Sequence, residues 1–587
     1  IMHNKQLDKT SKGALALTLL LEKLAALHQG EGGYIPPAYY IKALVLDYKI
    51  EIPQGAIKHL EELRKKAEAS TTAYKQLTAL LKSAYGQALR RVLKSKIFDP
   101  SNSNGPGVVE ILAKLSLLHQ EQGESATDPA LYIQEAVHDW QVIINDHARK
   151  YVARLREQYR SDVEAYKQLT ALLEQAYGQE LSHVTAKVLL EADATSQLVS
   201  ALDKLAQLHQ EQGQQTKNLK YYTDAAVLYQ TILHACQKDT QDNWHTERHA
   251  AYDGLAQIKK AMLATCKAKV TALKVVDLEQ QIENDKSLLE ALRARSKQQV
   301  EELDKLINQE GMSEQEEKKA EQMYIEGSEK LFGEITEGMK KFVARLYKEC
   351  EEELEEAPCN YTVIGMGSMA LQHITPYSDL EMAIIMDEPK DKATAKHYRD
   401  YLRKLTHLVH FRVINLGETV VPQNRYGVSL DHICHAGVQF DLGGKTPLNR
   451  IDEDKPYDLI QPVDGMMWYL KNEDEKAEHV DKLLPYLLES TYHIRGDKEL
   501  YESYVKERAM FLTTSKTAEG IPVYQARALH VLIEGIADWD YCQPKLSSGE
   551  FSIKSHKRGT LYQFKPQLVG GSSVAGQLYN VKQEIYR

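Results

Sequence analysis

The clearest pattern in this chain is the pair of segments Val363-Ile364-Gly365-Met366-Gly367-Ser368 and Asp379-Leu380-Glu381-Met382. The apolar run Tyr361 to Ile364 predicts a strand, and the run Leu380 to Met386 predicts a neighbouring strand. The Gly-Ser turn between them brings backbone N–H groups within reach of a phosphate. Because side chains alternate along a strand, we expect Asp379 and Glu381 to project from the same face.

Two carboxylates on one strand face can share a divalent cation. Mg²⁺ prefers oxygen ligands and is usually held by one or two carboxylates together with substrate phosphates and water. Two-metal phosphoryl-transfer centres commonly use a further acid, and the apolar stretch Gly437 to Gly444 offers Asp441 at the end of an expected third strand. We expect Asp441 to be the third carboxylate. Asp431 is the alternative, and an Asp before Gly-Gly also fits a simple strand-ending turn.

The order hydrophobic-Gly-Ser, then Asp-x-Glu between apolar residues, resembles the catalytic signature of the DNA polymerase β-like nucleotidyltransferase superfamily. The segment Gly367 to Glu381, with its Pro-Tyr-Ser-Asp element, is similar more narrowly to the N-terminal domain of protein-PII uridylyltransferases and their relatives, including versions fused to helical repeats. The segment His493-Ile494-Arg495-Gly496-Asp497, expected within a helical stretch, is similar to the family's Asp-Ala-Arg-x-x-x-Gly-Asp element. The resemblance covers roughly residues 330 to 587.

The resemblance implies transfer of a nucleoside monophosphate from an NTP to an acceptor hydroxyl, with release of pyrophosphate. It implies Mg²⁺ or Mn²⁺ held by the catalytic acids Asp379, Glu381 and Asp441. The residues then expected to bind the nucleotide are Gly367, Ser368, Ser378, Lys445 and Arg495. Neither UTP nor ATP is favoured by a local signature.

Two positions depart from the family's pattern. Relatives often carry an Arg-x-Glu pair after the Gly-Ser turn, and here the corresponding residues are Leu371 and His373. The departure favours a competing hypothesis, a non-catalytic repeat scaffold with a degenerate nucleotide-binding domain. The intact set of acids opposes it. An acceptor protein recruited by the helical repeats is the favoured substrate, and RNA or a small molecule is the alternative.

Other chemistries have less support. The cluster His432, Cys434 and His435 invites a zinc interpretation, but structural zinc sites usually combine two separated ligand pairs. No Walker A motif and no G-x-G-x-x-G fingerprint occur in the sequence.

The first half of the chain repeats itself at about 91 residues. Similar Leu-x-x-Leu-His-Gln segments begin at Leu24, Leu115 and Leu205, and each is followed by a glycine (Gly33, Gly123, Gly213) and a Tyr-rich second helix. Ala73 to Leu81 returns almost unchanged as Ala165 to Leu173. The pattern resembles tetratricopeptide repeats spaced by additional helices and predicts an α-solenoid with a surface for a partner protein or peptide.

We therefore predict a mainly α protein with an α/β domain. Residues 1–250 form a tetratricopeptide-like array, 251–357 long connecting helices, 358–470 the small mixed-sheet catalytic domain, and 471–587 a helical C-terminal segment. A helix is expected to start near Ser313, a loop is expected at Asn102 to Gly107, and a helix is expected from Gly576 to Arg587, where the given sequence stops as if within a longer protein.

Charge and composition limit the partners. The formal net charge of −10 disfavours broad nucleic-acid binding, although residues 543–587 carry a local charge of +5 (seven basic residues against two acidic ones). The apolar stretch Ala14 to Leu27 contains Glu22 and Lys23, so we expect a core helix rather than a signal peptide or membrane span. Six scattered cysteines fit a reducing compartment. We expect a cytoplasmic protein, or an exported effector that acts in a host cytosol.

Overall fold

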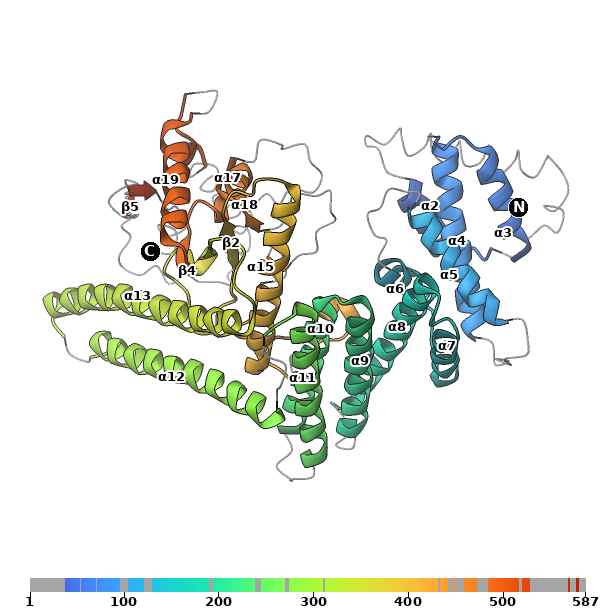
Figure 1. The fold of residues 1–587 in the computed structure, drawn as a ribbon, viewed down its shortest axis with the longest axis horizontal. Coiled ribbons are helices and arrows are strands. Elements are labelled where there is room, and N and C mark those ends of the chain that lie inside the picture. The colour runs from blue at the N-terminus through green and yellow to red at the C-terminus, as the bar shows by residue number, and fades with distance from the viewer. Residues whose placement is uncertain are drawn as a thin grey trace. The chain divides into compact units, whose positions relative to one another are not determined.

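The computed structural model describes most of the chain and divides it into two compact units (Figure 1). Unit 1 contains residues up to Leu208 together with Val421–Leu430, and unit 2 contains His209–Val420 and the residues from Asp431 onward. The described residues are 37–52, 54–69, 71–94, 104–120, 129–188, 194–237, 244–269, 274–309, 312–430, 433–441, 447–448, 459–471, 484–516, 520–527, 568–570 and 577–579.

Unit 1 consists of helices arranged in repeated modules. Its described helices are α2 (Pro37–Asp47), α3 (Gln54–Lys66), α4 (Thr72–Lys94), α5 (Asn104–Gln120), α6 (Pro129–Asp139), α7 (Asp146–Gln158), α8 (Val163–Val188), most of α9 (Ala194–Thr216) and the short α16 (Gln423–Tyr426). Leucine, isoleucine and alanine side chains of α2 to α8 form one continuous core. The Tyr-rich segments lie in α2 and α6, and the two near-identical segments lie in α4 and α8, as the repeat predicts.

The repeat extends to individual hydrogen bonds. Gln87 on α4 accepts from Ile52 N (2.8 Å) and donates to Ile50 O (2.7 Å), and so closes the turn before α3. In the next module Gln179 on α8 makes the same pair of bonds, to Ile144 N (2.9 Å) and Val142 O (2.6 Å). Arg64 and Arg156 are likewise placed over Tyr74 and Tyr166 and bond to Thr78 and Thr170. The two modules are therefore the same fold, built twice.

The repeats differ from the sequence-based predictions at two positions, and a third prediction falls outside the described residues. The predicted loop at Asn102 to Gly107 is wrong from Asn104 onward, because α5 begins there and Pro106 falls in its first turn, where proline is tolerated. Gly213, predicted to precede the second helix of its module, lies inside the first one, α9, where a Cβ would stand only 2.8 Å from the Tyr222 ring. The predicted helix Ala14 to Leu27 lies outside the described residues.

Unit 2 begins with helices that pack directly on the α/β domain. They are α10 (Leu219–Gln237), α11 (His245–Cys266), α12 (Val275–Ile307) and α13 (Glu314–Glu353). The predicted helix start near Ser313 is confirmed, since Ser313 caps α13 by accepting from Glu316 N. On α10, Gln230 donates to Asn415 Oδ1 (2.9 Å) and His234 bonds to Gly417 O (2.6 Å) at the end of α15 (Lys392–Val413), where a π-helical turn, η3 (Ile414–Glu418), follows.

A mixed four-stranded sheet forms the centre of unit 2. The strand order is β3-β2-β1-β4, with β1 (Tyr361–Gly365) antiparallel to β2 (Met382–Met386) and to β4 (Tyr492–Gly496), and β2 parallel to β3 (Ile460–Gln461). Every residue of β1 and β2 is buried, so both faces of these strands are covered. One face meets α17 (Val463–Lys471), α18 (Leu484–Leu487) and α19 (Lys498–Thr514) through an apolar core that includes Ile364 and Ile385.

A buried ion pair joins the long helices to the α/β domain. Arg412 on α15 donates to both carboxylate oxygens of Asp285 on α12 (2.6 to 2.9 Å) and to Glu349 on α13 (2.6 Å). The side chains of Arg412 and Asp285 are each only 3% exposed. Removing either partner of a buried ion pair leaves the other as an uncompensated charge, which is strongly destabilising. Helices α12 and α13 are therefore part of the folded α/β unit.

The C-terminal region, predicted as a helical segment, also contains strands. His493 to Gly496 lie in the edge strand β4, and α19 starts only after Asp497, whose carboxylate accepts from Leu500 N. The helix predicted from Gly576 is wrong at residues 577–579, which form β6 (Gln577–Tyr579), paired antiparallel with β5 (Leu568–Gly570). The wider prediction of a mainly α protein with a small α/β domain is confirmed. Within the described residues no helix is both long and apolar enough to span a bilayer.

The glutamine bonds in unit 1 give a first test. Gln179→Leu removes the partners of Ile144 N and Val142 O and is expected to lower the free energy of unfolding by about 1–3 kcal/mol. Gln87→Leu should behave alike, whereas Gln207→Leu, which loses only an exposed bond to Asp203, should stay within about 0.5 kcal/mol. Urea unfolding measures all three. A Gln179→Leu midpoint equal to that of Gln207→Leu would contradict the assignment.

Candidate functional site

The candidate site depends on how residues 438–441 pair with the segment before β2. Leu380 and Phe440 form a parallel bridge, in which Leu380 N donates to Gln439 O (2.7 Å) and Asp441 N donates to Leu380 O (3.2 Å). Leu380 and Phe440 are both buried, and His410 on α15 contacts the Phe440 ring edge-on. Burial lowers the pKa of His410 to about 3, so this contact is made by a neutral imidazole.

This register brings three acids to one edge of the sheet. Because neighbours of a buried strand residue point to the opposite face, Asp379, Glu381 and Asp441 share the face opposite Leu380 and Phe440. Asp379 is exposed, and Glu381 and Asp441 are half-buried. The described part of the chain holds no group of three or more His, Cys, Asp or Glu side chains already arranged around a common metal position. The acids therefore share a face without yet converging on one point.

The Gly-Ser turn lies directly against one of these acids. Met366 N donates to Glu381 O (2.9 Å), which extends the β1–β2 ladder into the turn. Gly367 adopts a φ of +53°, and a Cβ at this position would lie 1.3 Å from Glu381 Oε2. Only glycine fits both constraints, because the left-handed conformation is costly for other residues and the carboxylate fills the space of a side chain. Ser368 follows in a single helical turn, α14 (Gly367–Ala370).

The Pro-Tyr-Ser-Asp element is a compact turn before the acids. Thr375 N donates to Ser378 Oγ (3.0 Å), and Ser378 N donates to Thr375 O (3.1 Å). The Ser378 hydroxyl is thus used to close the turn. Arg293 on α12 donates to Pro376 O from two nitrogens (3.0 and 2.9 Å) and stacks on the Tyr377 ring at 4.2 Å.

Arg293 is a residue that the sequence analysis missed. It is nearly buried, with 7% of its side chain exposed, and it also forms a two-bond pair with Glu418 (2.5 and 2.7 Å). Burial alone would lower the pKa of Arg293, but the bonds to Glu418 and Glu290 outweigh burial and raise it. A signal was present: the buried positions of α12 include Leu278, Ile282, Leu289 and also Arg293, so a charge stands on the apolar stripe.

Arg495, another predicted nucleotide-binding residue, does not join the acidic edge. Arg495 on β4 pairs with Glu351 of α13. This hydrogen bond raises the pKa of Arg495 by more than burial lowers it. Tyr361 OH also donates to Glu351, and these residues line an open cavity at the start of β1, away from the Gly-Ser turn at its end. Lys445 lies outside the described residues, as do Asp431 and His432.

Leu371 and His373, the two positions that depart from the family's pattern, make local contacts after the Gly-Ser turn. Leu371 N donates to Gly367 O (3.1 Å), and His373 N donates to Ser368 O (2.8 Å). The His373 ring meets Phe332 of α13 edge-on at 5.6 Å between centroids. These residues therefore shape the turn.

A family comparison agrees with this geometry. Residues 321–425 match the family model described as Putative nucleotidyltransferase DUF294, a range that runs from α13 through β1 and β2 to α16. It includes Gly367, Asp379 and Glu381 and ends before Asp441. No curated protein matched the chain, and no solved structure matched it. The chain thus contains a nucleotidyltransferase-like domain.

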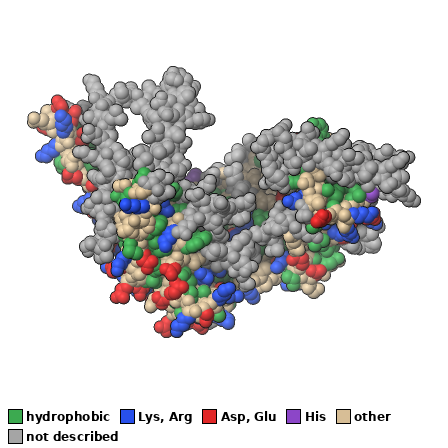
Figure 2. All heavy atoms as spheres, turned by 90° about the horizontal axis from the view of Figure 1, so that it is seen from above, with side chains coloured by type: hydrophobic (Ala, Val, Ile, Leu, Met, Phe, Trp, Pro, Cys, Tyr) green, Lys and Arg blue, Asp and Glu red, His purple; other side chains and the backbone are tan. Residues whose placement is uncertain are grey.

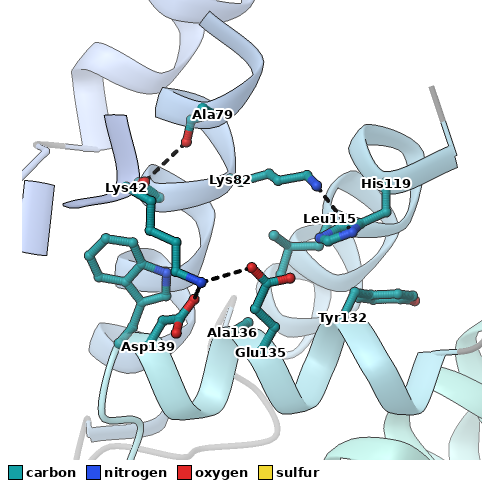
Figure 3. Close-up of a pocket in the computed structure, with 11 residues that line it drawn as sticks. Lys42, Ala79, Lys82, Leu115, His119, Tyr132, Glu135, Ala136 and Asp139 are labelled. Atoms are coloured by element: carbon teal, nitrogen blue, oxygen red, sulfur yellow. Dashed lines mark hydrogen bonds and ion pairs between the residues drawn. The ribbon is translucent and has the colours of Figure 1, made fainter. Parts of the chain in front are cut away.

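A second candidate site lies within unit 1. A cavity of about 320 Å³ opens between α2, α4, α5 and α6, and Figure 3 shows its polar side chains pointing toward one another. Lys42 pairs with Glu135 (3.0 Å) and Asp139 (2.5 Å), and Lys82 bonds to His119 Nδ1 (3.1 Å). A volume of a few hundred Å³ is typical of a ligand pocket, and here charged side chains form much of the lining.

The fit between the glycine and Glu381 leads to a second prediction. Gly367→Ala should lower the free energy of unfolding by at least about 1–2 kcal/mol, because alanine is strained at φ +53° and its methyl group must displace the Glu381 carboxylate. Gly333→Ala on α13 is the matched control, since nothing lies within 4 Å of its Cβ and alanine favours a helix. Thermal unfolding compares them. Equal melting temperatures for the two variants would refute the predicted clash.

Proposed function

We propose that this protein is a metal-dependent nucleotidyltransferase, similar to the uridylyltransferases, that moves a nucleoside monophosphate from an NTP onto a hydroxyl of a protein held by its helical repeats. The observation that carries the proposal is the Leu380–Phe440 bridge, since it sets Asp441 beside Glu381 on the face that also bears Asp379. The family match to residues 321–425 supports the same class of reaction.

The donor set fits a hard divalent cation. Asp379, Glu381 and Asp441 offer carboxylate oxygens, the ligands that Mg²⁺ and Mn²⁺ prefer, and substrate phosphates usually complete such sites. Mg²⁺ or Mn²⁺, when bound, would neutralise charge on the phosphates. The proposed site requires the three carboxylates to turn about their χ angles toward a shared ion; Asp379 is exposed, and Glu381 and Asp441 are half-buried.

The chain's own residues have distinct roles in the proposed reaction. Gly367 and Ser368 position the triphosphate, and Asp441 accepts the proton of the acceptor hydroxyl. The hydroxyl oxygen bonds to the α-phosphorus, the bond from that phosphorus to the oxygen bridging to the β-phosphate breaks, and pyrophosphate leaves. Alignment and charge neutralisation are the main demands of such a transfer. Ser378 and Arg495 contribute to structure, since their polar groups bind the turn and Glu351.

The proposed acceptor is a protein. The repeated modules of unit 1 and the cavity beside Lys42 and Lys82 offer a surface of the kind that α-solenoids use for partners. Figure 2 shows acidic and basic side chains of the described residues next to one another on one face, and the net charge of the whole chain is −10. Both features favour a protein over a nucleic acid, because affinity for polyanions depends on clustered lysine and arginine.

The labelling experiment uses the full chain with Mg²⁺ or Mn²⁺ and a cell extract. Each of the four NTPs is supplied labelled at the α-phosphate or, separately, at the γ-phosphate. We expect α-label on a protein band and release of pyrophosphate. Asp379→Asn should reduce labelling on the order of 100-fold or more, because a charge needed in the transition state is lost.

The same labelling experiment includes a control variant and distinguishes the alternative functions. Glu388→Gln changes an exposed acid just beyond β2 and should label as the parent does. Transfer of γ-label would indicate a kinase. Absence of labelling, with partner proteins retained equally by the parent and by Asp379→Asn, would favour the non-catalytic scaffold suggested by Leu371 and His373.

A further inference from the structure

The geometry points to Arg293 as a positioning residue that holds together the two chain segments bearing the proposed catalytic acids. This inference rests on the function proposed above and extends it to a residue on α12, outside the matched family range. Arg293 is a positioning residue and is not one of the proposed metal ligands. It acts on them through the backbone of the two segments.

The first segment is the turn before Asp379. The Arg293 guanidinium donates twice to Pro376 O, three residues before Asp379, and the Tyr377 ring covers it at 4.2 Å. A planar guanidinium can stack on an aromatic ring and still donate in its own plane, so one side chain makes both contacts.

The second segment leads to Asp441. Glu418 accepts two bonds from Arg293 and also accepts from Val438 N (2.7 Å), three residues before Asp441. The main chain of Glu418 adds a bond from Gly437 N (3.3 Å). The path from Pro376 through Arg293 and Glu418 to Val438 is thus continuous, and it spans the gap between the acid-bearing segments at the point where each approaches the bridge.

Burial makes this connection rigid. With 7% of its side chain exposed, Arg293 has little water to replace a lost partner, and charge-assisted two-bond pairs are stronger than neutral hydrogen bonds. A lysine keeps the charge but cannot reach Pro376 O and both oxygens of Glu418 at once. Arg293→Lys therefore removes the forked geometry while retaining a cation.

The test compares binding of Mn²⁺ with a non-hydrolysable NTP analogue, followed by electron paramagnetic resonance, and the Mg²⁺ dependence of labelling. Variants are Arg293→Lys and the milder Glu418→Gln. Arg412→Lys is the matched control, because Arg412 makes an equally buried fork, but to Asp285 and Glu349 on α12 and α13. Melting temperatures report the loss of stability in each variant.

We expect Arg293→Lys and Glu418→Gln to weaken Mn²⁺ binding by roughly 10- to 100-fold and to raise the Mg²⁺ concentration for half-maximal labelling in parallel. Arg412→Lys should lower the melting temperature and leave metal binding as in the parent. Parental Mn²⁺ affinity in both test variants, or equal weakening in Arg412→Lys, would overturn the inference while labelling by the parent protein persists. A parent protein that neither labels nor binds Mn²⁺ with the nucleotide would instead overturn the proposed function, and this inference with it.

Discussion

The parallel pairing of Leu380 with Phe440 is the constraint on which the candidate site depends. Two backbone hydrogen bonds fix it, and a shift of one residue would turn Asp441 to the buried face. The same edge of β2 continues with β3, where Ile384 pairs with Ile460. One parallel edge is therefore built from two segments of the chain, and Asp441 belongs to the first of them.

Such a short pairing needs support from outside the sheet. Arg293 and Glu418 connect the turn before Asp379 to the segment before Asp441. Among the described residues, a separate buried pair, Arg412 with Asp285, does not contact either acid-bearing segment and packs α12 against α15. Helix α12, which looks like a connector in the sequence, thereby becomes part of the α/β domain. The segment between Val420 and Asp431 belongs to unit 1, with Arg425 bonded to Glu174 at 3.0 Å, so the chain passes through unit 1 shortly before it reaches the acid.

Local sequence patterns correctly predicted the elements that depend on neighbouring residues, such as buried strands and capped helices. The apolar runs at Tyr361 and Leu380 are strands because all their side chains can be buried, and Ser313 starts a helix because it caps one. The strand β4 was missed, since Ile494 is its only fully buried residue and an edge strand with polar neighbours has no clear alternation. Arg293 was missed because Pro376 and Glu418, its partners near the acids, lie more than 80 residues away in the chain. Contacts between residues so far apart in the chain give no direct pattern in the sequence. The indirect sign here is a charged residue on the apolar face of α12.

The position of the bound metal ion would test the proposed site directly. Crystals of the full chain with Mn²⁺ and a non-hydrolysable NTP, measured at the manganese absorption edge, would locate the ion by anomalous scattering. We predict a peak within about 2.5 Å of oxygens of Asp379, Glu381 and Asp441, with the triphosphate beside Gly367. A bound nucleotide whose manganese peak lies away from these three acids would contradict it.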